Sequence, residues 1–145
     1  MRDALPVRTD RSFSAEEYID LMTAAQWGDA ADYDPATVEA AREAYHFVGH
    51  VRNEDGVLVG CCCAFSDSAF ATFVVQLVVH PFVQGRGIGA SLLEAVERAY
   101  PGIPVFALGF REARGFFLRK GFTIPSKAIE VFARLNARPA MAETG

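Results

Sequence analysis

The chain has 145 residues, of which 51% are hydrophobic and 22% charged, enough to bury one core and too few for two independent cores. Its formal net charge is −4 and no block of Lys and Arg residues stands out, so a nucleic-acid partner has no electrostatic support. No apolar run approaches the ~20 residues of a membrane-spanning helix, and residues 1–10 carry charges throughout, so we expect no membrane association and no secretory leader.

The three cysteines are consecutive, Cys61–Cys63. Neighbouring residues of a strand point to opposite faces, which disfavours a disulfide among them, and their spacing fits no metal site. Buried thiols behave as small apolar side chains. We therefore expect packing residues, no metal, and a reduced, cytoplasmic compartment.

Taken in chain order, the pattern first predicts a short strand at Val7–Thr9. Ser14–Glu17 is a capping box that begins an amphipathic helix. Gln26–Tyr33 is a polar, acidic loop. A second helix is expected from Asp34, as N-cap before a proline, to about Ala44.

The period then changes from helical to extended. Strands are predicted at His46–Arg52 and Val57–Phe65, because the Asp55-Gly56 step between them is a hairpin signal. A third strand is expected over Phe70–His80. These three strands should pair antiparallel.

The second half of the chain alternates helices and strands. We expect a helix at Gly87–Tyr100, a short strand at Pro104–Leu108, a helix at Glu112–Lys120, a final strand at Ala128–Leu135 and a loose tail at 138–145. The order predicts one domain over residues 1–137 of the α+β class (an α/β three-layer arrangement). Its central sheet should be mixed and mostly antiparallel, with helices on both faces.

A glycine-rich loop, Gln84–Gly89, stands directly after the third long strand and directly before a helix. A helix N-terminus presents unpaired N–H groups and a partial positive charge, which suit an anionic phosphate. Glycine lets the backbone approach such a group closely, and Arg86 could add a charge-assisted contact. The loop is therefore a candidate phosphate-binding site.

Other interpretations of this loop differ in what they require. A P-loop needs Lys-Ser/Thr at the helix start, and Ala90-Ser91 after Gly89 exclude it. Gly85, Gly87 and Ala90 satisfy a dinucleotide fingerprint, but the next strand ends without the acidic residue that this fold needs. A glycine turn that serves only the backbone remains open.

The segment Leu77–Gly89 resembles motif A of the GNAT acetyltransferase superfamily, whose pattern is Gln/Arg-x-x-Gly-x-Gly/Ala. Phe116–Phe122 is similar to the second signature of that family, Phe-Tyr-x-Lys-x-Gly-Phe. The two signatures stand in the expected order, and the resemblance covers about residues 45–134. It implies a GNAT-like fold and an N-acetyltransferase that uses acetyl-CoA.

The resemblance also implies a mechanism, in which an amine attacks the thioester of acetyl-CoA directly. It implies a bulge that splays the strand at 70–80 from the following one. The backbone of Leu77, Val78 and Val79 would then pair with the pantetheine arm, and an N–H near Val79 would polarise the thioester carbonyl. The rest of the implied cofactor site comprises Gln84, Gly85, Arg86, Gly87, Ile88, Gly89, Ala90, Phe110 and Phe117.

The sequence departs from the family pattern at three positions. Phe117 replaces a tyrosine that often protonates the departing thiolate, Phe110 replaces a cofactor-binding asparagine, and Gln76 stands where related sequences often carry a carboxylate base. A glutamine orients water but accepts no proton at neutral pH. The remaining candidates for a base are His80, Glu112 and the acidic loop, with Asp29, Asp32, Tyr33 and Asp34.

The acceptor implied by the resemblance is a small primary amine or a protein amino group, in a site lined by Trp27, Tyr33 and Gln76. A homodimer is compatible with the family. An acetyl-CoA-binding sensor or interaction module without transferase activity is the alternative that the three departures support. The sequence leaves the acceptor, the acid and base, the acyl length and the oligomeric state open.

Overall fold

The structure, a computed structural model, describes residues 5–124 and 131–134. The chain forms two compact units, one ending at Leu108 and the other beginning at Gly109. Within the described ranges, no helix combines the length and the apolar character needed to cross a membrane.

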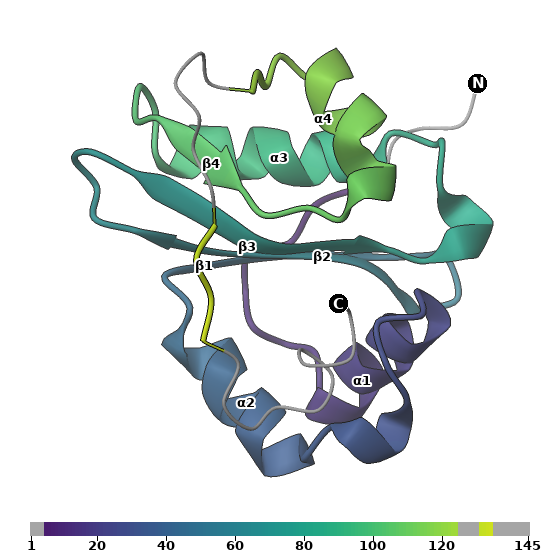
Figure 1. Ribbon diagram of the computed structural model, residues 1–145. Coiled ribbons are helices and arrows are strands. Elements are labelled where there is room, and N and C mark those ends of the chain that lie inside the picture. Colours follow the sequence, from purple (N-terminus) through teal and green to yellow (C-terminus); the bar gives the residue numbers. More distant parts are fainter. Residues whose placement is uncertain (1–4, 125–130, 135–145) are drawn as a thin grey trace. The chain divides into compact units, whose positions relative to one another are not determined.

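The first unit is built on a four-stranded sheet in the order β1-β2-β3-β4 (Figure 1). β1 (Phe47–Arg52), β2 (Leu58–Ser66) and β3 (Thr72–Val79) pair antiparallel, and β4 (Val105–Ala107) pairs parallel with β3. Tight turns join the antiparallel strands, whereas a helical crossover leads to the parallel one. The predicted mixed, mostly antiparallel sheet is confirmed.

Helices cover both faces of this sheet, as predicted. α1 (Ala15–Ala24) and α2 (Pro35–Ala44) lie on one face, and α3 (Ile88–Ala99) lies on the other (Figure 1). Ser14 and Glu17 form the expected capping box of α1. The loop before α2 contains a short 3-10 helix, Ala30–Asp32, that the sequence did not reveal.

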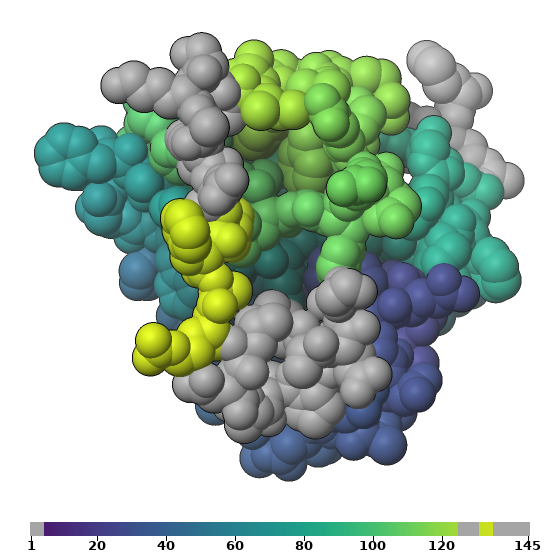
Figure 2. All heavy atoms as spheres, viewed as in Figure 1, coloured from purple at the N-terminus to yellow at the C-terminus, as the bar shows by residue number. Residues whose placement is uncertain are grey.

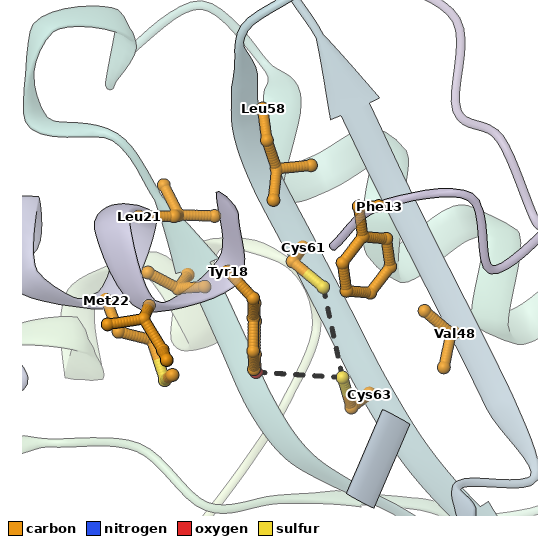
Figure 3. Close-up of a cluster of buried hydrophobic side chains, with 10 residues drawn as sticks. Phe13, Tyr18, Leu21, Met22, Val48, Leu58, Cys61 and Cys63 are labelled. Atoms are coloured by element: carbon orange, nitrogen blue, oxygen red, sulfur yellow. Dashed lines mark hydrogen bonds between the residues drawn. The ribbon is translucent and has the colours of Figure 1, made fainter. Parts of the chain in front are cut away.

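The core between α1 and the sheet is built around two thiols of β2 (Figure 3). The Tyr18 hydroxyl lies 3.8 Å from Cys63 Sγ, and Cys61 Sγ lies 3.9 Å from Cys63 Sγ. Burial raises the pKa of Tyr18 and of Cys61. All three cysteines are buried and unbridged, which confirms their packing role.

A bulge interrupts β3 near its middle. Cys63 pairs with Gln76 and Ala64 pairs with Val74, so Val75 is an extra residue in the ladder. The bulge changes which residues of β3 direct their backbone groups toward β2.

Before the bulge, residues 72–74 of β3 are hydrogen-bonded to β4 and to the residues on either side of it. The Thr72 N–H donates to the Pro104 carbonyl at 2.9 Å, and the Val74 carbonyl accepts from the Leu108 N–H at 3.1 Å. β4 ends there, because its pairing with β3 covers only 72–74. The bulge that the family resemblance implied is therefore present, and the pairing of β3 with β4 stops before it.

The second unit contains a 3-10 turn, Arg111–Ala113, that continues into α4 (Arg114–Arg119). The Phe117 ring lies 5.2 Å from both the Phe116 and the Phe122 ring. Gly121 follows α4 with φ +87°, the left-handed value expected of a capping glycine. The predicted helix at 112–120 is present, although its first turn is 3-10.

Two predicted strands need correction. At Val7–Thr9 only Arg8 pairs, in a single bridge to His50, because the Asp10 carboxylate accepts the Ser12 N–H and turns the chain away. The strand expected over 128–135 lies partly outside the described residues. Its described part, 131–134, forms no strand, and Val131 and Phe132 are exposed. The tail at 138–145 lies outside the described residues.

Candidate functional site

The loop after β3 leads to the N-terminus of α3 through two glycines in left-handed conformation. Gly85 and Gly87 both have φ +82°, and Gly87 is the N-cap of α3. A Cβ built at either glycine would meet no atom within 4 Å, so the space above this backbone is open. Figure 2 shows this loop, in teal, at the surface on the right-hand side.

The first turn of α3 offers donors to that open space. The Ser91 N–H closes the first helical bond, to the Gly87 carbonyl at 3.0 Å, which leaves the N–H groups of residues 88–90 without helical acceptors. The turn carries no acidic residue, and Arg86 beside it is exposed. The helix dipole, the amides and the guanidinium together favour an anion such as a diphosphate.

The start of α3 is held in position by its packing against the sheet. Ile88 packs over Gly60 of β2, where a Cβ would lie 2.8 Å from Ile88 Cγ2. From the loop, Gln84 Nε2 donates to the Val79 carbonyl at 3.2 Å and so ties the loop to the end of β3. These two contacts therefore hold the candidate anion site in a fixed position relative to the end of β3.

Beyond the bulge, β3 has an open edge. The His80 N–H donates to the Val59 carbonyl of β2 at 2.8 Å. Since backbone groups of successive strand residues alternate in direction, those of Val78 also face β2, whereas those of Leu77 and Val79 face away from it. None of the described strands pairs with that side of Leu77 and Val79. An extended molecule with amide groups can pair there and end at the α3 N-terminus.

Gln76 lies beside the bulge, on the face that α1 covers. It pairs with Cys63, whose side chain belongs to the core under α1. Gln76 Oε1 is buried and has no hydrogen-bond partner among the described residues. A buried acceptor without a donor is costly, so a hydrogen bond from a ligand N–H or a water would stabilise this oxygen.

Trp27 and Tyr33 come together, as the sequence suggested. Both are partly buried and pack against the core cluster that Val75 also contacts. The Tyr33 hydroxyl donates to the Trp27 carbonyl, and burial raises the pKa of Tyr33. The loop before α2 thus presents two aromatic side chains on the face that carries Gln76.

The candidate bases lie in different surroundings. His80 shares the face of Gln76, and its Nδ1 accepts the Phe82 N–H at 3.2 Å within a 3-10 turn. It lines a pocket of ≈ 270 Å³ together with residues of α1 and of the β1–β2 turn, among them Glu17, Asp20 and Asp55. In the acidic loop, Asp32 accepts from the Asp29 N–H, and Asp34 accepts from Thr37 at the start of α2. The part of the chain that the structure describes contains no metal-binding cluster.

Phe110, Glu112 and Phe117 belong to the second unit. Phe110 is the N-cap of the 3-10 turn and Glu112 is exposed within it. Phe117 lies close to Gly109, where a Cβ would approach its ring at 2.8 Å. The other predicted site residues belong to the first unit.

Sequence reasoning missed two features of the site. One is the hydrogen bond from Gln84 to Val79, which no local pattern signals. The other is a row of aromatic side chains on the Gln76 face, formed by Tyr45, Phe65, Phe73 and Phe106. The sequence did show that Phe65 and Phe73 lie in two neighbouring strands of a hairpin. It did not show the register that sets the two residues opposite each other.

Comparison with known proteins agrees with this geometry. A family model described as an acetyltransferase (GNAT) domain matches residues 42–124. No curated protein gives a significant match.

Several solved structures share the fold. A GNAT-family acetyltransferase from Streptococcus pneumoniae has a TM-score of 0.72 at 20% identity, covering 92% of this chain and 98% of its own. A protein from Xanthomonas campestris assigned to the same family has a TM-score of 0.71 at 25% identity, with coverages of 98% and 99%. The aminoglycoside N-acetyltransferase AAC(6')-Iy, solved in complex with CoA, has a TM-score of 0.70 at 19% identity, with coverages of 93% and 98%.

Proposed function

The chain belongs to the GNAT acetyltransferase family, and we propose that it moves an acetyl group from acetyl-CoA to a primary amine. The observation that carries the proposal is the open edge of β3 beyond the bulge at Val75, which runs directly to the donor-rich start of α3. Members of this family use acetyl-CoA, and one of the structural neighbours is an enzyme that acetylates amino groups of aminoglycosides.

The residues present fit CoA. A Cβ at Gly85 or Gly87 would project into the open space above this backbone, and the amides of residues 88–90 with Arg86 match a diphosphate. Leu77 and Val79 would pair with the amides of the pantetheine arm as an added strand does with a sheet edge. The sequence-based prediction for Val78 is wrong in this respect: its backbone groups face β2 and its side chain is buried, so it would not pair with the arm.

Acetyl-CoA supplies an acetyl group activated as a thioester. Within this chain, the Val79 N–H faces the open edge and would donate to the oxygen that gains negative charge during attack. Gln76 Oε1 would accept one N–H of the incoming amine or hold a water that does so. The new C–N bond forms as the C–S bond breaks, and the amine loses one proton while the CoA sulfur leaves as thiolate.

No carboxylate stands at Gln76 to receive that proton, so we assign it to water, with His80, which follows β3 and shares the face of Gln76, as the candidate base. Strand geometry separates residues 76 and 80 by about 13 Å, so His80 would act through solvent. Phe117 and Phe110 belong to the second unit, and their role in CoA binding stays a prediction from the sequence. A thiol pKa of about 8.5 makes unassisted departure of the thiolate tolerable.

The test is release of CoA thiol from acetyl-CoA in the presence of primary amines, with the acetylated product identified by mass spectrometry. Amine-dependent release, absent with the matching tertiary amine, is the expected result. Thiol release that is the same with and without every amine contradicts the transfer reaction.

The second candidate is an acetyl-CoA-binding module without turnover, which the carboxamide at position 76 favours, because Gln76 accepts no proton. Its signature is micromolar binding of acetyl-CoA with no acetylated product. A binding titration with acetyl-CoA together with the thiol-release assay therefore distinguishes the two candidates.

A further inference from the structure

Four aromatic residues, Tyr45, Phe65, Phe73 and Phe106, form a continuous row across the sheet. Phe65 pairs with Phe73, and Phe73 pairs with Phe106, so their side chains lie on one face of three neighbouring strands. The Phe73 and Phe106 rings are stacked, with centroids 5.1 Å apart and planes 20° apart. The Tyr45 ring lies 5.0 Å from the Phe65 ring and ends the row.

The aromatic row and Gln76 share one face. Gln76 pairs with Cys63, and Phe65 follows Cys63 by two residues on β2, which places both on the same side of the sheet. Phe73 precedes Val75, the bulge residue, by the same interval, or about 7 Å along the strand. A ring on the row and an amine at Gln76 are therefore separated by the length of a short linker.

The aromatic row is only partly covered. Phe65, Phe73 and Phe106 keep 41%, 43% and 40% of their surface exposed. α2, the helix that leads into Tyr45, contains no buried residue, whereas α1 buries five of its ten. A contiguous exposed aromatic surface beside a reaction site is typical of a ligand-binding surface.

The charges around the row do not favour a polycation. Glu39 and Glu43 both pair with Arg42 of the same helix, at 3.5 and 3.1 Å. The Asp67 carboxylate accepts the N–H groups of residues 69, 70 and 71, which lower its pKa and hold the β2–β3 turn. These carboxylates already have partners, so the surface is complementary to a ring rather than to several ammonium groups.

We propose that the aromatic row is the acceptor subsite and that the acceptor is a primary amine carrying an aromatic ring, not a polyamine or an aminoglycoside. The inference rests on the proposed function, because it takes the amine nitrogen to lie at Gln76. Stacking on the Phe73–Phe106 pair would select an aromatic ring over a saturated ring of the same size by about 3- to 10-fold in affinity.

The experiment is calorimetric titration of the CoA-saturated protein with 2-phenylethylamine, 2-cyclohexylethylamine and spermidine. Phe73→Leu and Phe106→Leu, which keep an apolar side chain, test the row. Phe70→Leu is the matched control, because Phe70 is 81% exposed in the β2–β3 turn and outside the row. Circular dichroism and analytical ultracentrifugation check the fold and the mass of each variant.

The expected result is tightest binding of 2-phenylethylamine, with the preference over the cyclohexyl amine lost in Phe73→Leu and Phe106→Leu and kept in Phe70→Leu. Equal affinity for the two ring amines, tighter binding of spermidine, or no amine binding overturns the inference. A change of mass in the row variants would also overturn it, by assigning the row to an interface between copies. Binding of the aromatic amine without acetylated product would support the subsite and contradict the proposed transfer reaction alone.

Discussion

Ile88, the first residue of α3, packs so closely over Gly60 of β2 that a single added methyl group at residue 60 would lie 2.8 Å from Ile88 Cγ2. Leu92, one turn later in α3, would be 3.3 Å away. Gly60 pairs with Val79, the last residue of β3. Gly60 thus contacts both the start of the anion-binding helix and the end of the open strand edge, and so fixes their relative position.

Gly60→Ala should therefore weaken acetyl-CoA binding as well as the fold. We expect a loss of about 1–3 kcal/mol in the free energy of unfolding from overpacking, and a fall of about 10-fold in acetyl-CoA affinity as α3 shifts. Urea unfolding and calorimetry measure the two effects. Gly49→Ala is the control, because its Cβ would meet Phe47 at 3.1 Å, on β1 and away from the loop. Equal loss of affinity in both variants would contradict this account.

Gln76→Glu should place a proton acceptor beside the bulge. If proton removal from the amine limits turnover, kcat should rise by about 10-fold or more, since a positioned general base contributes roughly 10²–10⁴-fold. The pH–rate profile should gain an acidic limb that the wild-type protein lacks. Gln76→Met, which removes the acceptor oxygen at similar volume, should raise KM for the amine. An unchanged kcat in Gln76→Glu would place the slow step elsewhere.

Acidification should destabilise the protein in two separate windows. His50 is fully buried, and burial lowers its pKa below 6.5, opposed by the Asp10 carboxylate 3.7 Å away. The unfolded chain then binds a proton that the folded chain does not, so stability falls as the pH drops below about 6.5. His50→Phe should flatten this window in urea titrations between pH 8 and pH 5. A persistent slope in that variant would assign the effect to another group.

The second window belongs to Glu17. Its hydrogen bonds with Arg52 and with the Ser14 N–H lower the pKa of Glu17 from 4.5 to about 2. The stabilisation is therefore complete above pH 4.5 and is lost as the pH falls toward 2. Glu17→Gln should reduce the acid sensitivity in this window only, and should cost a fraction of a kcal/mol at pH 7 because the pair is partly exposed.

The cysteines should be unreactive in the folded protein. Burial raises the pKa of Cys61 and of Cys62, so little thiolate forms and no path leads to it. A thiol reagent such as DTNB should label none of the three in native buffer and all three in urea. Rapid native labelling would mean that β2 opens at low cost.

Local patterns predicted the parts of the fold that depend on local chemistry. The capping box at Ser14, the N-cap at Asp34 and the turn at Gly56 each act within a few residues, and each lies where the sequence indicated. The glycine loop was recognised for the same reason. The neighbouring strand β3 was predicted from its pattern, whereas its bulge was expected only because the family resemblance implied it.

Features that depend on pairing between distant residues could not be read from the sequence. The aromatic row requires the β2–β3 register that sets Phe65 against Phe73, and the orphaned oxygen of Gln76 requires the bulge opposite Cys63. The single bridge at Arg8 depends on Asp10 turning the chain after one pair. Each is decided by tertiary geometry that a one-dimensional pattern does not contain.

The measurement that tests the central claim most directly is calorimetric titration of acetyl-CoA onto the wild-type protein, Gly87→Ala and Gly102→Ala. Both glycines have positive φ with no atom within 4 Å of a Cβ, so both substitutions carry similar backbone strain, and only Gly87 belongs to the proposed diphosphate site. We expect micromolar binding to the wild-type protein and to Gly102→Ala, at least a 10-fold loss in Gly87→Ala, and no binding of NAD. Absence of acetyl-CoA binding to the wild-type protein, or equal affinity in all three, would contradict the assignment of this loop.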